Sequence, residues 1–188
     1  MGSSYQTVLA TGELGDVRAA VTASGGEAVV RAVAAGRWAV VPRPQEGYAD
    51  TAALARLLTR APDAVAATFD VIDSDLLVAG VFRAGRSVHD YLSEQSIVEE
   101  GWDENDNEIL FDGLGRTYPP GATVPSGPYG ADAAVFAPLA AAPVDEAKLT
   151  AVLAATDLRG EDRHHQLLHL LAVDPAPLQM SYEEALAL

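Results

Sequence analysis

Residues 64–92 read AVAATFDVIDSDLLVAGVFRAGRSVHDYL, and this stretch decides the fold. It contains three segments rich in apolar, β-branched and aromatic residues, which are typical of strands: 64–72, 76–83 and 87–92. Asp73-Ser74-Asp75 and Ala84-Gly85 separate these segments, and such short connections join antiparallel neighbours. The stretch therefore predicts a three-stranded antiparallel meander whose buried positions include Val71, Leu77, Val81 and Val88.

The segments around the meander predict further strands and helices. Residues 5–10 and 38–41 favour strands. Residues 13–35 have a helical pattern that Ser24-Gly25-Gly26 interrupts, so we expect one helix before this break and another over 28–35. Further helices are expected over 51–59, 131–141, 145–155 and 161–172, with a last short element near Met180 to Tyr182. We therefore predict a single α+β domain over residues 1–188, with a mostly antiparallel sheet and helices packed on one face.

The composition indicates a chain that can bury a hydrophobic core. Of the 188 residues, 49% are hydrophobic, which argues against global disorder. Cysteine is absent from the sequence, so neither a disulfide framework nor a cysteine zinc site can form. No apolar run approaches the roughly 20 residues of a membrane helix, and the N-terminus lacks the basic and apolar regions of a secretory signal. These features lead us to expect a cytoplasmic protein.

The net charge of −15 limits the classes of partner. Such a field repels phosphate backbones and anionic lipid surfaces, so we expect no nucleic-acid partner and no membrane partner. Two interpretations of the charge stay open. The surplus carboxylates keep an apolar, alanine-rich chain in solution, or they attract a basic protein partner.

The segment 93–128 is an acidic, Gly/Pro-rich excursion, and excursions of this length are usually functional or disordered. It contains a short hairpin pattern, with strands near 109–111 and 116–118. Carboxylates crowd around a tryptophan in its first half, and an aromatic anchor within a charged rim is typical of protein interfaces. The candidate partner-binding residues are Glu99, Glu100, Trp102, Asp103, Glu104 and Asp106. The alternative is a solvated loop whose Trp102 packs against the core.

Residues 103–112 partly match a calcium-binding loop. Asp103, Asn105 and Asn107 take the first, third and fifth positions of an EF-hand loop. Glu108 then stands where the loop requires glycine, and Leu114 where it requires a bidentate glutamate. The spacing excludes an EF-hand and leaves open only a looser calcium site.

A metal-dependent or small-molecule-binding enzyme is the alternative function, with two candidate sites. Asp73 and Asp75 can hold a divalent cation, although Asp and Ser are also ordinary turn residues. His165 and His169 are four residues apart, a spacing that zinc uses on helices. Leucines surround these two and His164, so we expect the helix to pack through its leucines and to bind no metal. The sequence has no phosphate-binding glycine loop or nucleophile elbow, and we expect no cofactor and no catalytic residue.

Two runs in the middle of the chain resemble a group of uncharacterised bacterial α+β proteins. FDVIDSDLL at 69–77 is similar to that group's "DSD-hydrophobic" strand pair, and VFRAGRSVHDYLS at 81–93 to its "GxxVxxY-S" strand. RHHQLL at 163–168 and Tyr182 are similar to its closing helix and strand. These motifs describe folding rather than catalysis. The group in turn looks like the small immunity proteins that accompany toxin systems, which is an analogy of fold alone.

The resemblance implies a non-enzymatic protein-interaction module of the immunity-protein kind, and the net charge adds the expectation that its partner is basic. The acidic segment after Ser93 is longer than its counterpart in that group. The resemblance therefore implies no role for this segment. The sequence also leaves the oligomeric state open.

Overall fold

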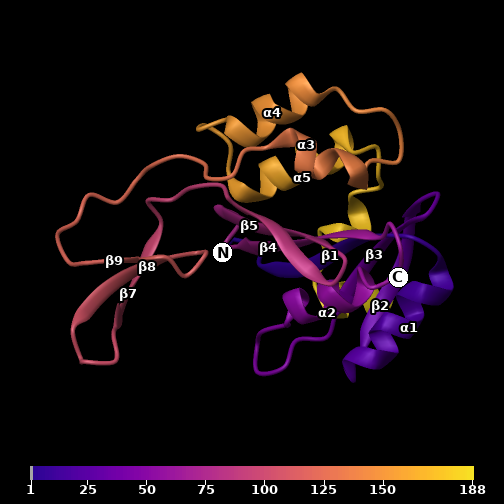
Figure 1. Ribbon diagram of the computed structural model, residues 1–188, viewed down its shortest axis with the longest axis horizontal. Coiled ribbons are helices and arrows are strands. Elements are labelled where there is room, and N and C mark those ends of the chain that lie inside the picture. Colours follow the sequence, from indigo (N-terminus) through magenta and orange to yellow (C-terminus); the bar gives the residue numbers. More distant parts are fainter. Residues whose placement is uncertain (1) are drawn as a thin grey trace.

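A computed structural model describes residues 2–188 of the chain. The described residues form an antiparallel sheet of six strands in the order β2-β3-β1-β4-β5-β6. A smaller sheet, β7-β8-β9, projects from the body of the molecule (Figure 1). The strands of the large sheet are β1 (Tyr5–Thr11), β2 (Ala28–Ala34), β3 (Arg37–Pro42), β4 (Val65–Ile72), β5 (Leu76–Arg83) and β6 (Arg86–Leu92).

The helices confirm the α+β class expected from the sequence. They are α1 (Leu14–Ser24), α2 (Thr51–Leu58), α3 (Ala133–Phe136), α4 (Glu146–Ala154), α5 (Gly160–Leu170) and α6 (Tyr182–Ala187), with 3₁₀ turns η1 (Ala137–Leu139) and η2 (Ala176–Leu178). Within residues 2–188, none of these helices has the length and apolar character needed to cross a bilayer.

The predicted meander is confirmed as β4, β5 and β6, which pair antiparallel in chain order. Both of its turns have a left-handed backbone. The φ angles are 49° at Asp73 and 63° at Ser74 in the first turn, and 48° at Ala84 and 74° at Gly85 in the second. Two consecutive left-handed residues give a turn whose twist matches that of the flanking strands. Three of the expected core positions are fully buried: Val71, Leu77 and Val81.

The prediction that Val88 is buried was wrong, because 51% of this residue is exposed. Val81 of β5 pairs with His89 of β6. The next residue of β5, Phe82, pairs with Ser87. Val88 is therefore the extra residue of a β-bulge, which removes it from the alternation that places every second side chain in the core.

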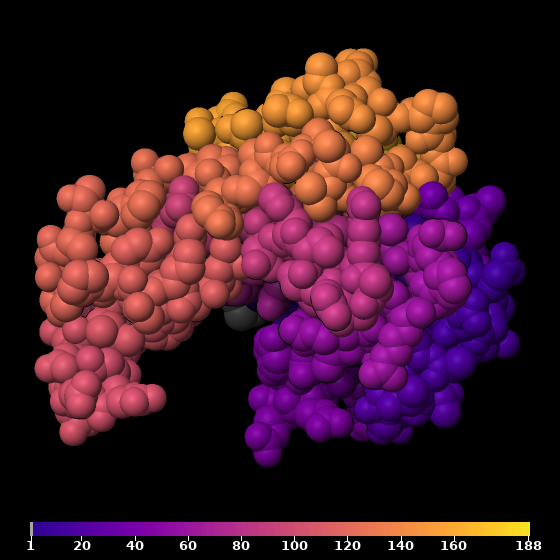
Figure 2. All heavy atoms as spheres, in the orientation of Figure 1, coloured from indigo at the N-terminus to yellow at the C-terminus, as the bar shows by residue number. Residues whose placement is uncertain are grey.

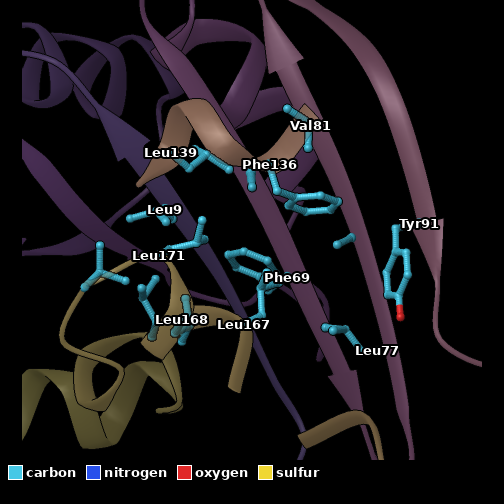
Figure 3. Packing of buried hydrophobic residues seen from close by; sticks show 14 of the residues in the cluster. Leu9, Phe69, Leu77, Val81, Tyr91, Phe136, Leu139, Leu167, Leu168 and Leu171 are labelled. Atoms are coloured by element: carbon cyan, nitrogen blue, oxygen red, sulfur yellow. The ribbon is translucent and has the colours of Figure 1, made fainter. Parts of the chain in front are cut away.

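Helices lie on both faces of the large sheet, which corrects the expectation of one covered face. α1 and α2 cover one face and share a core with Val8 and Phe82. α3, α4 and α5 cover the other face, over Leu9 and Phe69 (Figures 1 and 3). Strand β4 is buried without a break from Val65 to Phe69. Because both sides of this central strand are apolar, each face of the sheet needs its own helical layer.

The second expected helix, over residues 28–35, is instead the strand β2. Helix α1 ends where Gly25 takes a φ of 71° and donates its amide to the carbonyl of Thr22. The residues after this stop include Val29 and Val30, whose β-branched side chains favour an extended backbone. Pairing with β3 along the length of β2 then fixes the strand.

The Asp73-Ser74-Asp75 turn holds the N-terminus of α5. The amide of Gly160 donates to the carbonyl of Asp75 at 2.8 Å, and the amide of Glu161 donates to that of Ser74 at 3.0 Å. A side chain at Gly160 would collide with the backbone of Leu76, so the helix can approach this closely only through glycine. The carboxylate of Asp75 also pairs with Arg159 at 2.9 Å. The turn therefore joins the meander to the C-terminal helices.

Candidate functional site

The acidic segment 93–128 contains the small sheet, formed by β7 (Val98–Trp102), β8 (Glu108–Asp112) and β9 (Thr117–Tyr118). The expected hairpin near 109–118 is confirmed as β8 and β9. Strand β7 pairs with the other side of β8 and was not predicted. The candidate partner-binding residues thus lie on and next to an edge strand of the small sheet.

One face of the small sheet carries the tryptophan. Residues directly opposite each other on antiparallel strands share a face. Glu100 pairs with Leu110, and Trp102 pairs with Glu108, so these four side chains form what we name the tryptophan face. Trp102 is 72% exposed. This exposure overturns the alternative in which Trp102 packs against the core.

The opposite face of the small sheet is more apolar. Glu99 pairs with Phe111, and Gly101 pairs with Ile109. A side chain on Gly101 would lie only 2.8 Å from the ring of Phe111, so this ring covers the glycine backbone directly. We name these four residues the phenylalanine face. Glu99 is the one candidate residue that this face contains.

Asp103 organises the turn at the end of the β7–β8 hairpin. Its Oδ1 accepts from the amides of Asn105 and Asn107 at 2.8 and 2.9 Å, and the side-chain amide of Asn107 donates to both of its oxygens. These hydrogen bonds, led by the one from the Asn107 side chain, lower the pKa of Asp103. Glu104 and Asp106 are exposed in the same turn. Only these last two present carboxylates that are free of hydrogen bonds within the turn.

A buried carboxylate that the sequence did not single out holds the base of the small sheet. Asp112 is 3% exposed, and its Oδ2 accepts from Arg116 Nε at 2.8 Å and from the Tyr118 hydroxyl at 2.9 Å. Its Oδ1 accepts from the amides of Leu114 and Arg116. Burial alone would raise the pKa of Asp112, but these hydrogen bonds lower it overall. The guanidinium of Arg116 also lies 4.2 Å from the centre of the Tyr129 ring. Tyr129 in turn pairs with Leu92 at the end of β6, so this contact links the small sheet to the large one.

A groove separates the small sheet from the large one, and Figure 2 shows the hollow between them. One part has a volume of about 510 Å³ and lies between Ile72, Glu99 and Phe111. The adjoining part has a volume of about 580 Å³ and shares Ile72 and Glu99 with the first. Every charged side chain that the described residues contribute to the two parts is acidic: Asp70, Asp73, Asp75, Glu99, Asp112 and Glu183. We name this hollow the acidic groove.

Three carboxylates line the second part of the groove, and that of Asp70 is the least exposed to solvent. Its Oδ2 accepts from Gln6 Nε2 at 3.0 Å, and the side-chain Oε1 of Gln6 accepts from the backbone amide of Ala49. Burial raises the pKa of Asp70, and the hydrogen bond from Gln6 partly offsets this effect. A carboxylate that has lost part of its water gains more from an approaching cation than a fully solvated one does.

Helix α5 separates the three histidines that the sequence groups together. His164 is fully buried, with Nδ1 3.0 Å from the Tyr5 hydroxyl and its ring 4.4 Å from that of Phe69. Burial, with a smaller contribution from His165, lowers the pKa of His164 to about 3, so the ring is neutral. His165 and His169 are exposed on the other side of the helix. The expectation that the helix packs through its leucines is confirmed for Leu167 and Leu168.

The candidate enzyme site at Asp73 and Asp75 has a structural use. Asp75 is engaged with Arg159, and the backbone of the turn caps α5. Across residues 2–188, no group of three or more His, Cys, Asp or Glu side chains is arranged to hold a metal ion.

Comparisons with protein-family models, with curated proteins and with solved structures found no match for this chain.

Proposed function

We propose that the protein is a non-enzymatic interaction module that binds a basic partner protein through its small sheet and acidic groove. The observation that carries the proposal is Trp102, which is 72% exposed and lies beside Glu100 and opposite Glu108 on the tryptophan face. Tryptophan gains more from burial at an interface than almost any other side chain. An arginine or lysine of the partner can lie over its indole ring and pair with the neighbouring carboxylates.

The charge of the molecule supports the same class of partner. The net charge is −15, and the groove beside the small sheet is lined by carboxylates. Such a surface accelerates the approach of a basic protein and disfavours acidic ones. Within this class, the analogy between immunity proteins and the uncharacterised group that the meander resembles favours an antagonist that covers the active surface of a basic protein.

The candidate residues take different parts in this proposal. Glu100 and Trp102 provide the contact on the tryptophan face, and Glu99 provides charge on the groove side. Glu104 and Asp106 extend the charge to the end of the hairpin. Asp103 holds the turn and is a positioning residue.

Charge reversal on the small sheet tests the proposal. The variant replaces four exposed carboxylates with lysine: Glu99, Glu100, Glu104 and Glu108. We expect its unfolding free energy to change by less than about 1 kcal/mol, because exposed charges contribute little. We expect it to lose the basic proteins that the wild type retains from a native lysate. Added salt should release the same proteins from the wild type.

A second variant with four reversals elsewhere controls for net charge. It carries lysine at the exposed positions Glu13, Asp63, Glu146 and Asp157, outside the small sheet and groove. This control should retain the partner. Equal losses in both variants would mean that binding follows net charge alone, and unchanged retention in the first variant would remove the small sheet from the interface. Either result contradicts the proposal.

A further inference from the structure

The two exposed histidines of α5 form a pair that the proposed function does not use. His165 and His169 are four residues apart and therefore lie on the same side of the helix. Their Nε2 atoms are 2.9 Å apart. On the other edge of the His165 ring, Nδ1 lies 2.7 Å from the side-chain oxygen of Gln179. Gln179 follows the 3₁₀ turn η2, so a second element orients the ring.

These distances fix the chemistry of the pair. An amide oxygen can only accept a hydrogen bond, so Nδ1 of His165 carries the proton that faces Gln179. In the neutral ring, Nε2 of His165 then has a free lone pair. This lone pair accepts the hydrogen bond that His169 Nε2 donates. Histidines that bind metals are oriented in the same way, with the second ring nitrogen donating to a carbonyl or carboxylate oxygen.

We propose that His165 and His169 bind a late first-row transition-metal ion, and Cu²⁺ most tightly, because the affinity of nitrogen ligands rises along this series to copper. Metal–nitrogen bonds of about 2.0 Å that meet at a right angle place the two nitrogens about 2.8 Å apart, and a tetrahedral angle places them about 3.3 Å apart. The observed Nε2–Nε2 separation is 2.9 Å. Nitrogens this close need only a small rotation of the rings to bind the same ion.

Binding requires only a change of tautomer at His169. Its proton moves from Nε2 to Nδ1 through solvent, and the metal ion binds beside the line that joins the two Nε2 atoms, so that the lone pair of each ring can turn toward it. His165 keeps the tautomer that Gln179 already fixes. Within the described residues no third His, Cys, Asp or Glu side chain completes the set. The other coordination positions therefore belong to water or to a donor from another molecule, and the site is exchangeable rather than structural.

A direct titration with Cu²⁺ tests the site, using protein without a histidine tag and electron paramagnetic resonance as the readout. The wild type should bind one equivalent whose spectrum shows coupling to two imidazole nitrogens. His165→Gln and His169→Gln should each weaken this binding at least tenfold, because each leaves a single ligand. Gln179→Leu removes the oxygen that orients His165 and should weaken binding about tenfold.

His89→Gln is the matched control, because this histidine lies on β6 and its ring bonds to the carbonyl of Gly130. It should bind Cu²⁺ as the wild type does. Thermal unfolding of each apo protein shows whether a variant is folded, and the exposed positions on α5 should tolerate glutamine. The proposal is overturned if the wild type binds Cu²⁺ no better than the double variant His165→Gln/His169→Gln. In that case the 2.9 Å contact is only a hydrogen bond.

Discussion

His164 is a neutral histidine in the core, and its protonation is coupled to unfolding. The ring lies against Tyr5 and Phe69, and burial lowers its pKa from 6.5 to about 3. In the unfolded chain the same ring takes up a proton near its ordinary pKa. Between these two pKa values the unfolded chain binds more protons than the folded one. The stability that His164 contributes is therefore complete above about pH 6.5 and falls as the pH is lowered toward 3.

We expect acidification from pH 7 to pH 5 to lower the unfolding free energy by about 2 kcal/mol through His164. The variant His164→Phe keeps an aromatic ring in the core but cannot take up a proton. Its lost hydrogen bond to Tyr5 lowers stability by an amount that does not depend on pH in this range. Denaturant unfolding of both proteins at the two pH values measures the difference.

Other groups respond to acid in the opposite direction and cancel in this comparison. Asp70 has a raised pKa, so protonation relieves the cost of burying its charge. Acid also reduces the repulsion within a chain of net charge −15. Relative to the wild type, the unfolding free energy of His164→Phe should therefore rise by about 2 kcal/mol between pH 7 and pH 5. Parallel pH responses of the two proteins would show that His164 is not held neutral.

For single residues, the sequence predicts burial where a side chain follows the regular alternation of a strand. Val71 does so, and Val88 does not because of the bulge. Arg163 was beyond prediction, since its sequence neighbours are polar and yet it is 1% exposed. Its guanidinium donates to four carbonyls where α4 ends, those of Val152, Leu153, Ala155 and Leu158. Such a residue is buried because the folded chain provides hydrogen-bond acceptors for it, and these acceptors cannot be identified from its sequence neighbours.

At the scale of elements, the end of α5 has an unusual residue. Ala172 follows the C-cap and has a φ of 55°. Its amide donates to the carbonyl of His169, and the amide of Val173 donates to that of Leu168. This pair of bonds is the Schellman motif, in which glycine normally takes the left-handed position. The side chain of Ala172 therefore strains a backbone that glycine would adopt freely.

We expect Ala172→Gly to stabilise the protein by about 0.5–1 kcal/mol, because the relief of strain exceeds the greater chain entropy of glycine. The same substitution inside a helix should have the opposite sign. Ala151 is exposed in the middle of α4, and Ala151→Gly should cost about 0.5–1 kcal/mol. Thermal or denaturant unfolding measures both. A loss of stability in both variants would mean that Ala172 is not left-handed in solution.

The elements themselves could be predicted where local signals agree. The meander has strand-forming residues and short turns, and both signals indicate the same structure. Residues 28–34 have a mixed signal, since alanine favours helix and valine favours strand. Pairing with β3 decides in favour of strand, and this contact is not visible in the local sequence. Strand β7 was missed for a similar reason, because its carboxylates and Gly101 are unusual in strands.

At the scale of the whole molecule, the fold class follows from the order of helical and strand patterns, but the acidic groove does not. Asp70, Glu99 and Glu183 lie far apart in the sequence, and only the packed structure places them around one hollow. The net charge is compatible with a basic partner but does not indicate where such a partner would bind. The proposal places that location on the small sheet. The helices cover both faces of the large sheet, whereas the small sheet projects from the body of the molecule (Figure 1).

The most direct test of the proposed interface is photo-crosslinking from the position of Trp102 in a native lysate. A photoreactive phenylalanine derivative replaces Trp102 in one variant. In the control it replaces Ala19, which is exposed on α1, and this helix lies at the opposite end of the molecule from the small sheet (Figure 1). We predict that irradiation joins the first variant to a basic protein, identified by mass spectrometry, and that the control does not capture it. Crosslinking of the same proteins from both positions, or of none from Trp102, would contradict the account.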